Sequence, residues 1–195
     1  MDQDNETLVK NIQKSFLNLL NEHLPSKFLE KLKEKNKIKI LSIGCGRFRE
    51  AKPIFEYFRD FQDKLNLYGI DTNSELLKLA KQEKAILKHA DASIQENFAD
   101  WIIDGLFNLI IVRHPEITFN TDAFIKIFTN CLSMLEKDGY LLITTHFENE
   151  KESIKLLLKL LKYNLLTEIE NANPPSIKRN SEVLFADKFL LIASV

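Results

Sequence analysis

The feature that most constrains the fold of this chain is a regular alternation of strand-like and helix-like segments. Short segments rich in Ile, Val, Leu and Tyr predict strands, and stretches with apolar residues three and four positions apart predict amphipathic helices. This alternation is typical of strand–helix units that build a parallel sheet with helices on both faces. The predicted strands are Ile38–Ile43, Leu65–Ile70, Ile86–His89, Phe107–Arg113 and Tyr140–Thr145. The predicted helices are Glu50–Phe61, Ser74–Glu83, Ser93–Ile103, Thr121–Leu135 and Glu150–Leu161, and Gly139 is expected to end the fourth of them in a left-handed conformation.

The two ends of the chain depart from this alternation. Residues 1–36 predict a helical cap on the sheet, and residues 37–195 predict one compact α/β domain. The cap helices are expected at Asp4–Asn21 and Ser26–Glu34, on either side of Pro25. Near the other end, Leu165–Ile169 and Phe189–Ala193 are strand-like, but the segment between them shows no helical pattern. Two strands joined without a crossover helix pair antiparallel, so we expect an antiparallel strand at the end of the chain.

Composition excludes several classes of protein. Hydrophobic residues make up 45% and charged residues 28% of the 195 residues, which indicates a globular chain rather than a disordered one. The net charge of −1 lacks the basic excess that usually accompanies binding to a phosphate backbone. Cys45 and Cys131 are the only cysteines and no Cys/His cluster has zinc-ligand spacing, so we expect no metal site. With no signal peptide and no long apolar run, we expect a cytoplasmic protein that does not bind membranes.

The sharpest local motif is ILSIGCGR, residues 40–47, in which a buried strand runs into a GxG turn and then a helix. Glycines are needed there because the backbone must turn tightly and approach a ligand with no Cβ in the way. In the dinucleotide fingerprint GxGxxG a third glycine would stand at position 49, which is Arg49, and this disfavours NAD and FAD. A tight turn without any ligand is the other interpretation of this motif.

Polar residues also stand at the carboxyl ends of the other predicted strands, where ligands bind in open α/β sheets. Asp71 ends the second strand, where a carboxylate can accept both ribose hydroxyls of a nucleoside or can cap the next helix. Asp91, after the third strand, is a candidate ligand-binding residue or the N-cap of the following helix. Arg113 and His114 follow the fourth strand, and His146 follows the fifth. His114 is a candidate general base or a solvated loop histidine, and Arg113 can hold an anionic group of a substrate.

These strand-end motifs resemble those of the class I S-adenosylmethionine-dependent methyltransferases. ILSIGCGRF is similar to the family's (L/V)(D/E)(I/V)GCGxG, YGIDTNSELLKLAK to VxGxDxSxxxLxxA, and LEKDGYLLIT to LkpGGxLxi. The resemblance covers residues 37–195 and implies a doubly wound, mostly parallel seven-stranded sheet of order 3-2-1-4-5-7-6, with strand 7 antiparallel. It implies S-adenosyl-L-methionine as the cofactor, with contacts from Ser42, Gly44, Cys45, Gly46, Asp71, Thr72, Asp91, Ala92 and Arg113.

Several positions depart from the family pattern. Ser42 stands where an acidic residue near the methionine amino group is common, and Phe48 stands where a third glycine is common and is expected to add bulk under the ligand. Asn108 replaces an aspartate and Asp138 replaces a glycine. The segment RHPE is not the (N/D)PP(Y/F/W) motif of many amino-group methyltransferases, which disfavours DNA as the acceptor. Because Ser42 and Phe48 both withdraw favourable features from the methionine end, we expect cofactor affinity toward the weak end of the family's range.

The resemblance favours transfer of a methyl group from S-adenosylmethionine to a nucleophile. An in-line displacement needs mainly positioning and a dry pocket, so the motifs identify the cofactor better than the substrate. His114 and Arg113 are the candidate catalytic residues, and a small molecule is the favoured acceptor, with a protein or nucleic acid left open. Two other hypotheses remain: a non-catalytic S-adenosylmethionine-binding protein and a nicotinamide-dependent oxidoreductase. The second is disfavoured because the chain has no Tyr-x-x-x-Lys pair.

Overall fold

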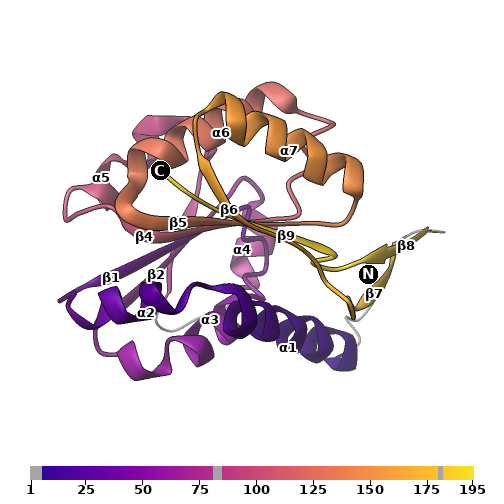
Figure 1. Ribbon diagram of the computed structural model, residues 1–195, viewed down its shortest axis with the longest axis horizontal. Helices are drawn as coiled ribbons and strands as arrows, with labels where there is room; N and C mark the ends of the chain where they lie inside the picture. Colours follow the sequence, from indigo (N-terminus) through magenta and orange to yellow (C-terminus); the bar gives the residue numbers. More distant parts are fainter. Residues whose placement is uncertain (1–5, 81–84, 180–181) are drawn as a thin grey trace.

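The central sheet of the computed structural model has the strand order β3-β2-β1-β4-β5-β9-β6 (Figure 1). The structure describes residues 6–80, 85–179 and 182–195. The strands are β1 (Ile38–Ile43), β2 (Leu65–Asp71), β3 (Ala85–His89), β4 (Phe107–Arg113), β5 (Leu135–Thr145), β6 (Asn164–Glu170) and β9 (Phe189–Ser194). The first five pair in parallel, and β9 pairs antiparallel with both β5 and β6. The expected order is confirmed, with β9 in the place of the predicted seventh strand.

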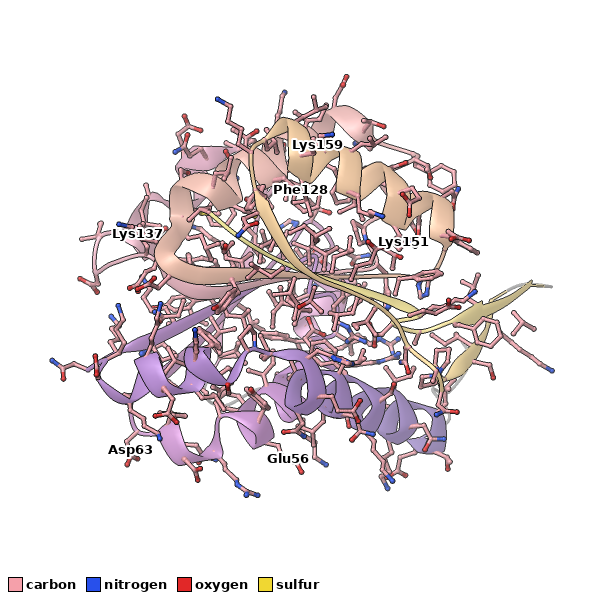
Figure 2. The ribbon with its side chains drawn as sticks, viewed as in Figure 1. Glu56, Asp63, Phe128, Lys137, Lys151 and Lys159 are labelled. Carbon is pink, nitrogen blue, oxygen red and sulfur yellow. The ribbon has the colours of Figure 1, made fainter. Side chains whose placement is uncertain are left out.

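Helices cover both faces of this sheet, as Figure 1 shows. One face carries α1 (Glu6–His23), α2 (Ser26–Lys33), α3 (Ala51–Tyr57) with the 3-10 turn η1 (Arg59–Phe61), and α4 (Ser74–Lys78). The other carries η2 (Gln95–Phe98), α5 (Ala99–Ile102), α6 (Thr121–Met134) and α7 (Glu148–Leu160). On this second face Phe128 of α6 is buried and points toward the sheet, and Lys159 of α7 is exposed and points away from it (Figure 2). Helices that cover a sheet have an apolar inner side and a polar outer side of this kind.

The apolar core is divided by the sheet into two layers. The layer under α1–α3 includes Phe16, Phe28 and Phe58, which are almost completely buried, so the N-terminal helices share one apolar cluster with the sheet. The opposite layer is built around Phe98 of η2 and Trp101 of α5, together with apolar residues of β4, α6 and α7. Because both faces are covered, β1 is buried at every position and its sequence is a nearly continuous apolar run.

The one lysine in β1 shows how the sheet accommodates a buried charge. Lys39 is 2% exposed, and its ammonium donates hydrogen bonds to the carbonyl oxygens of Gly105, at 2.6 Å, and Trp101. The backbone N–H of Lys39 donates to Oδ1 of Asn108 at 2.9 Å. Asn108 therefore ties β4 to β1 at the end of the sheet opposite the carboxyl ends of the parallel strands.

Three local expectations differ from the structure. The β7–β8 hairpin (Ser176–Arg179 and Glu182–Phe185), which precedes β9 and projects from the sheet, was not expected from a segment without an evident alternating pattern. The predicted helix Glu50–Phe61 is shorter, because it ends at Tyr57 and continues only as a 3-10 turn. The predicted helix Ser74–Glu83 is also shorter, because α4 ends at Lys78. Asp4 and Glu83, where helices were expected to start and end, lie outside the described residues.

The prediction that Gly139 ends a helix in the left-handed conformation is wrong. Gly139 lies inside β5, which begins directly after α6. A Cβ at this position would lie 2.9 Å from Cδ1 of Leu135 and 3.0 Å from the carbonyl oxygen of Asn108. Glycine is needed at position 139 because two strands approach closely there.

Candidate cofactor-binding site

The turn between β1 and α3 has the open backbone geometry that its glycines suggested. Gly44 and Gly46 have φ values of 68° and 51°, in the left-handed region where an L side chain is strained. The N–H groups of Gly44 and Cys45 both donate to the carbonyl oxygen of Ile70, at 2.8 and 3.2 Å, which fixes the turn to the end of β2. A Cβ added to Gly44 would meet nothing within 4 Å, so the backbone faces open space in which a ligand can lie.

Asp71 joins this turn to the end of β2. Its Oδ2 accepts a hydrogen bond from the N–H of Gly46 at 2.7 Å, and its Oδ1 accepts one from the N–H of Asn73 at 2.7 Å. Helix α4 is capped by Asn73, whose side chain accepts from the N–H of Leu76 at 3.0 Å. The alternative interpretation of Asp71 as the cap of this helix is therefore wrong.

Asp91 is also not a helix cap. Its Oδ1 accepts from the N–H of Ser93 at 2.8 Å within a turn, and η2 begins only at Gln95. The side chain of Asp91 is exposed, whereas Ala92 is buried and its carbonyl oxygen accepts from the Asn130 side chain of α6 at 3.0 Å. The end of β3 is thus held against α6, and the Asp91 carboxylate lies at the rim of the sheet.

Two cavities meet along this rim. One, of about 530 Å³, lies over the ends of β2, β3 and β4. Its walls include Gly44, Asp71, Thr72, Asp91, Ala92, Arg113 and His114, with Phe119 and Phe124 on the α6 side. The other, of about 410 Å³, lies between the glycine turn, α1 and the β7–β8 hairpin, and its walls include Ile12, Gly44, Cys45, Glu50, Arg113, His114 and Ile177. Gly44, Leu76, Arg113 and His114 line both cavities, so the two cavities adjoin.

Two residues expected to contact the cofactor lie behind these cavities. Ser42 is 1% exposed and lines neither cavity, and its hydroxyl instead donates to Oε1 of Glu50 at 2.5 Å. Gly46 lines neither cavity and contributes its N–H to Asp71. Phe48, expected to add bulk under the ligand, is fully buried and packs against Gly69 in the core. Its backbone takes the left-handed φ of 53° that a glycine would adopt, while its ring points away from the cavities.

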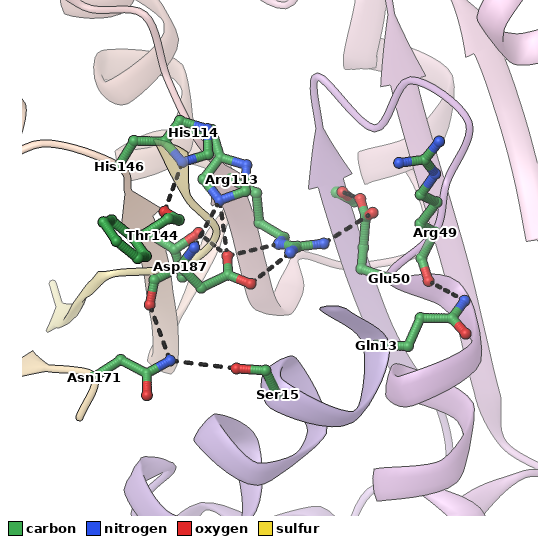
Figure 3. Close-up of polar contacts among 12 residues, drawn as sticks. Gln13, Ser15, Arg49, Glu50, Arg113, His114, Thr144, His146, Asn171 and Asp187 are labelled. Atoms are coloured by element: carbon green, nitrogen blue, oxygen red, sulfur yellow. Dashed lines mark hydrogen bonds and ion pairs between the residues drawn. The ribbon is translucent and has the colours of Figure 1, made fainter. Parts of the chain in front are cut away.

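A buried ionic network lies where the two cavities join (Figure 3). Asp187 is fully buried and receives the Arg113 guanidinium in a bidentate pair, with Nε 3.1 Å from Oδ1 and Nη2 2.6 Å from Oδ2. The hydroxyl of Thr144 donates to Oδ1 at 2.6 Å. Burial alone would raise the pKa of Asp187, but Arg113 and His114 hold it well below its usual range. Arg113 also lies 4.4 Å over the ring of Phe16, so α1 forms part of the site.

Two stacked histidines complete the network. The rings of His114 and His146 lie 3.8 Å apart at 16°, and Nδ1 of His146 donates to the carbonyl oxygen of Phe185 at 2.8 Å. Burial and the neighbouring His114 lower the pKa of His146. Nε2 of His114 lies 3.1 Å from the backbone nitrogen and 3.0 Å from Oδ1 of Asp187, so it accepts from the first when unprotonated and donates to the second when protonated. His114 is therefore fixed in place and is not a solvated loop residue.

Asp187 and Glu50 were not identified from the sequence. Asp187 stands between the apolar segment LFA and Lys188, without a motif around it, and it contacts residues more than seventy positions away. Glu50 lies four residues after Gly46 of the glycine turn. The one available signal for it was that Ser42 stands where the family has an acidic residue, so an acid nearby in the sequence could have been considered as its substitute. Of the described residues, no group of three or more His, Cys, Asp or Glu side chains is arranged to hold a metal ion.

The strand order, the antiparallel β9 and the glycine turn define the fold of the class I S-adenosylmethionine-dependent methyltransferases. An S-adenosylmethionine-dependent methyltransferase from Corynebacterium glutamicum is similar over 97% of this chain and 99% of its own, with a TM-score of 0.57 and 19% identity. Another from Clostridium acetobutylicum is similar over 95% and 98%, with a TM-score of 0.57 and 14% identity. Magnesium protoporphyrin IX methyltransferase from Synechocystis, solved with the cofactor bound, is similar over 100% and 86%, with a TM-score of 0.55 and 13% identity. No protein-family profile and no curated protein sequence matches the chain.

Proposed function

We propose that this protein binds S-adenosylmethionine and transfers its methyl group to a small-molecule acceptor. The observation that carries the proposal is the pair of adjoining cavities at the rim of the sheet, which are lined by the open glycine turn, the Asp71 carboxylate and the side chains of Arg113 and His114. Similar folds in known methyltransferases support it. The absence of a basic excess favours a small molecule over a nucleic acid. In the part of the chain that the structure describes, no helix is long and apolar enough to cross a membrane.

The residues present fit the two halves of this cofactor. A carboxylate oxygen can accept more than one hydrogen bond, so Asp71 can receive the ribose hydroxyls while it holds the N–H groups of Gly46 and Asn73. The Thr72, Asp91 and Ala92 side of the larger cavity is assigned to adenine. The open backbone of Gly44 and Cys45 leads into the smaller cavity, which is assigned to the methionine half.

The bound cofactor supplies an activated methyl group on a sulfonium, and the chain supplies position and proton transfer. His114 lines both cavities and is held against Asp187. We assign it the role of general base, which takes the proton from the acceptor nucleophile. Arg113 is fixed by Asp187 and Glu50, which suits a role in orienting His114 and the acceptor.

Calorimetric titration tests the cofactor first. We expect S-adenosylhomocysteine to bind with a dissociation constant at or below roughly 100 μM, equivalent to about −5.5 kcal/mol. NAD serves as the control ligand and is expected not to bind. No heat with S-adenosylhomocysteine at millimolar concentration contradicts the proposal. Methyl transfer from labelled S-adenosylmethionine to metabolites of a cell lysate then tests turnover.

A second candidate function is cofactor binding without catalysis. One observation favours it: both Arg113 and His114 are engaged with the buried Asp187, so neither side chain is presented only to a substrate. Tight binding of S-adenosylhomocysteine combined with no methyl transfer to any small-molecule fraction would support this function over the first.

A further inference from the structure

Glu50 is a buried carboxylate whose charge is balanced only in part. It is 5% exposed and precedes the first residue of α3. Its Oε1 accepts from the hydroxyl of Ser42 at 2.5 Å, and its Oε2 lies 3.6 Å from Nη1 of Arg113. The same guanidinium is closer to Asp187, at 2.6 Å, so two buried carboxylates share one arginine (Figure 3). A buried carboxylate that lacks a full partner is costly, and a ligand that brings a positive charge relieves that cost.

The position of Glu50 specifies where such a ligand group would lie. Glu50 lines the smaller cavity together with Gly44 and Cys45 of the glycine turn. Arg47 and Arg49 line the same cavity, so its wall carries both signs of charge. A wall of this kind complements a zwitterion such as the amino-acid end of a ligand, with the ammonium group directed to the acid and the carboxylate to the arginines.

We propose that Glu50 binds the α-ammonium group of the methionine half of the cofactor. The inference rests on the proposed function and assigns a residue that no motif indicated. Ser42, at the position where an acid was expected, does not reach the cavity but donates its hydroxyl to Glu50. The acidic group is thus supplied from the start of α3 and oriented by the serine of β1. Burial raises the pKa of Glu50, against the opposing effects of Arg113 and Ser42, and a neighbouring ammonium group favours its charged form.

Three ligands and two variants test this assignment by calorimetry. The ligands are S-adenosylhomocysteine, its deaminated analogue, which lacks only the amino group, and methylthioadenosine, which lacks the whole amino-acid end. Glu50→Gln removes the charge and keeps the shape. Glu56→Gln is the matched control, because Glu56 is on α3, the helix that Glu50 directly precedes, but is exposed and points away from the sheet (Figure 2).

We expect Glu50→Gln to weaken S-adenosylhomocysteine by about tenfold or more, since a hydrogen bond between charged groups is lost. The same variant should weaken the deaminated analogue and methylthioadenosine by less than about threefold, because neither presents an ammonium group to position 50. Glu56→Gln should leave all three affinities unchanged. The wild-type protein should itself prefer S-adenosylhomocysteine to the deaminated analogue by about tenfold.

Two results would overturn the assignment while leaving the proposed function intact: equal wild-type affinity for S-adenosylhomocysteine and its deaminated analogue, or equal weakening of all three ligands by Glu50→Gln. The first comparison uses only the wild-type protein, so it remains decisive even if Glu50→Gln does not fold, and melting temperatures establish whether it does. If neither S-adenosylhomocysteine nor methylthioadenosine binds the wild-type protein, the proposed function fails and the Glu50 assignment fails with it.

Discussion

Replacing Asp187 by asparagine removes the negative charge from the buried network with little change in shape. Asparagine tolerates the left-handed φ of 50° at this position, so the backbone is not newly strained. The Arg113 side chain is only 10% exposed and would lose its bidentate partner, leaving Glu50 at 3.6 Å as its remaining carboxylate contact in the network. The variant therefore tests what an under-compensated buried guanidinium costs.

Breaking a buried ion pair by removing one partner costs about 3–5 kcal/mol. For a chain of 195 residues each kcal/mol lowers the melting temperature by about 2–4 °C, so we expect Asp187→Asn to lower it by roughly 6–20 °C. Urea unfolding followed by circular dichroism gives the free energy of unfolding, and thermal unfolding gives the midpoint. Asp91→Asn, which changes an exposed aspartate at the same rim, should alter the free energy of unfolding by less than about 1 kcal/mol.

A triple variant separates the unpaired charge from other effects. Arg113→Met alone would leave the buried Glu50 carboxylate without its cation, so Asp187→Asn is combined with both Arg113→Met and Glu50→Gln, which removes all three charges. This should recover part of the lost stability, because no buried charge of the network is left without its partner. A loss of less than about 1 kcal/mol in Asp187→Asn would refute the reasoning, as would a triple variant less stable than Asp187→Asn alone.

Three further predictions concern the site and the sheet. Asp71→Ala should weaken S-adenosylhomocysteine by at least about tenfold in calorimetry, and should cost about 1–2 kcal/mol of stability because two backbone N–H groups lose their acceptor; unchanged binding would exclude the ribose role. The pKa of His146 is lowered in the folded state, so the neutral ring contributes stability above the unfolded pKa of about 6.5, and this contribution is lost as the pH falls below that value. Thermal unfolding of the wild type between neutral pH and about pH 5 should therefore show a melting temperature that falls with pH, and the fall should be smaller in His146→Gln. Gly139→Ala should lower the free energy of unfolding by about 1–3 kcal/mol in urea, because the added Cβ would lie 3.0 Å from the carbonyl oxygen of Asn108, and a neutral result would show that the two strands separate easily.

The sequence by itself determined the architecture and the rim at which the site lies. The alternation of strand and helix patterns is local, because each pattern repeats over a few residues and each buried strand, such as Ile38–Ile43, carries its own apolar run. Parallel strands present their carboxyl ends to one edge, so motifs that follow strands must meet there. For this reason Gly44, Asp71, Asp91 and Arg113 could be placed on one rim before any contact was known, and all four line the cavities.

Only the tertiary structure decided which side chains complete that rim and which lie behind it. Asp187 reaches Arg113 across 74 positions of sequence, and no local pattern records a pairing of that kind. Ser42 was expected to leave the site without an acid, but its hydroxyl orients Glu50, an arrangement that depends on the direction in which α3 leaves the turn. The same dependence placed the ring of Phe48 in the core instead of under the ligand. Side-chain direction at a tight turn follows from backbone dihedrals and packing across elements, and these are settled only when the layers come together.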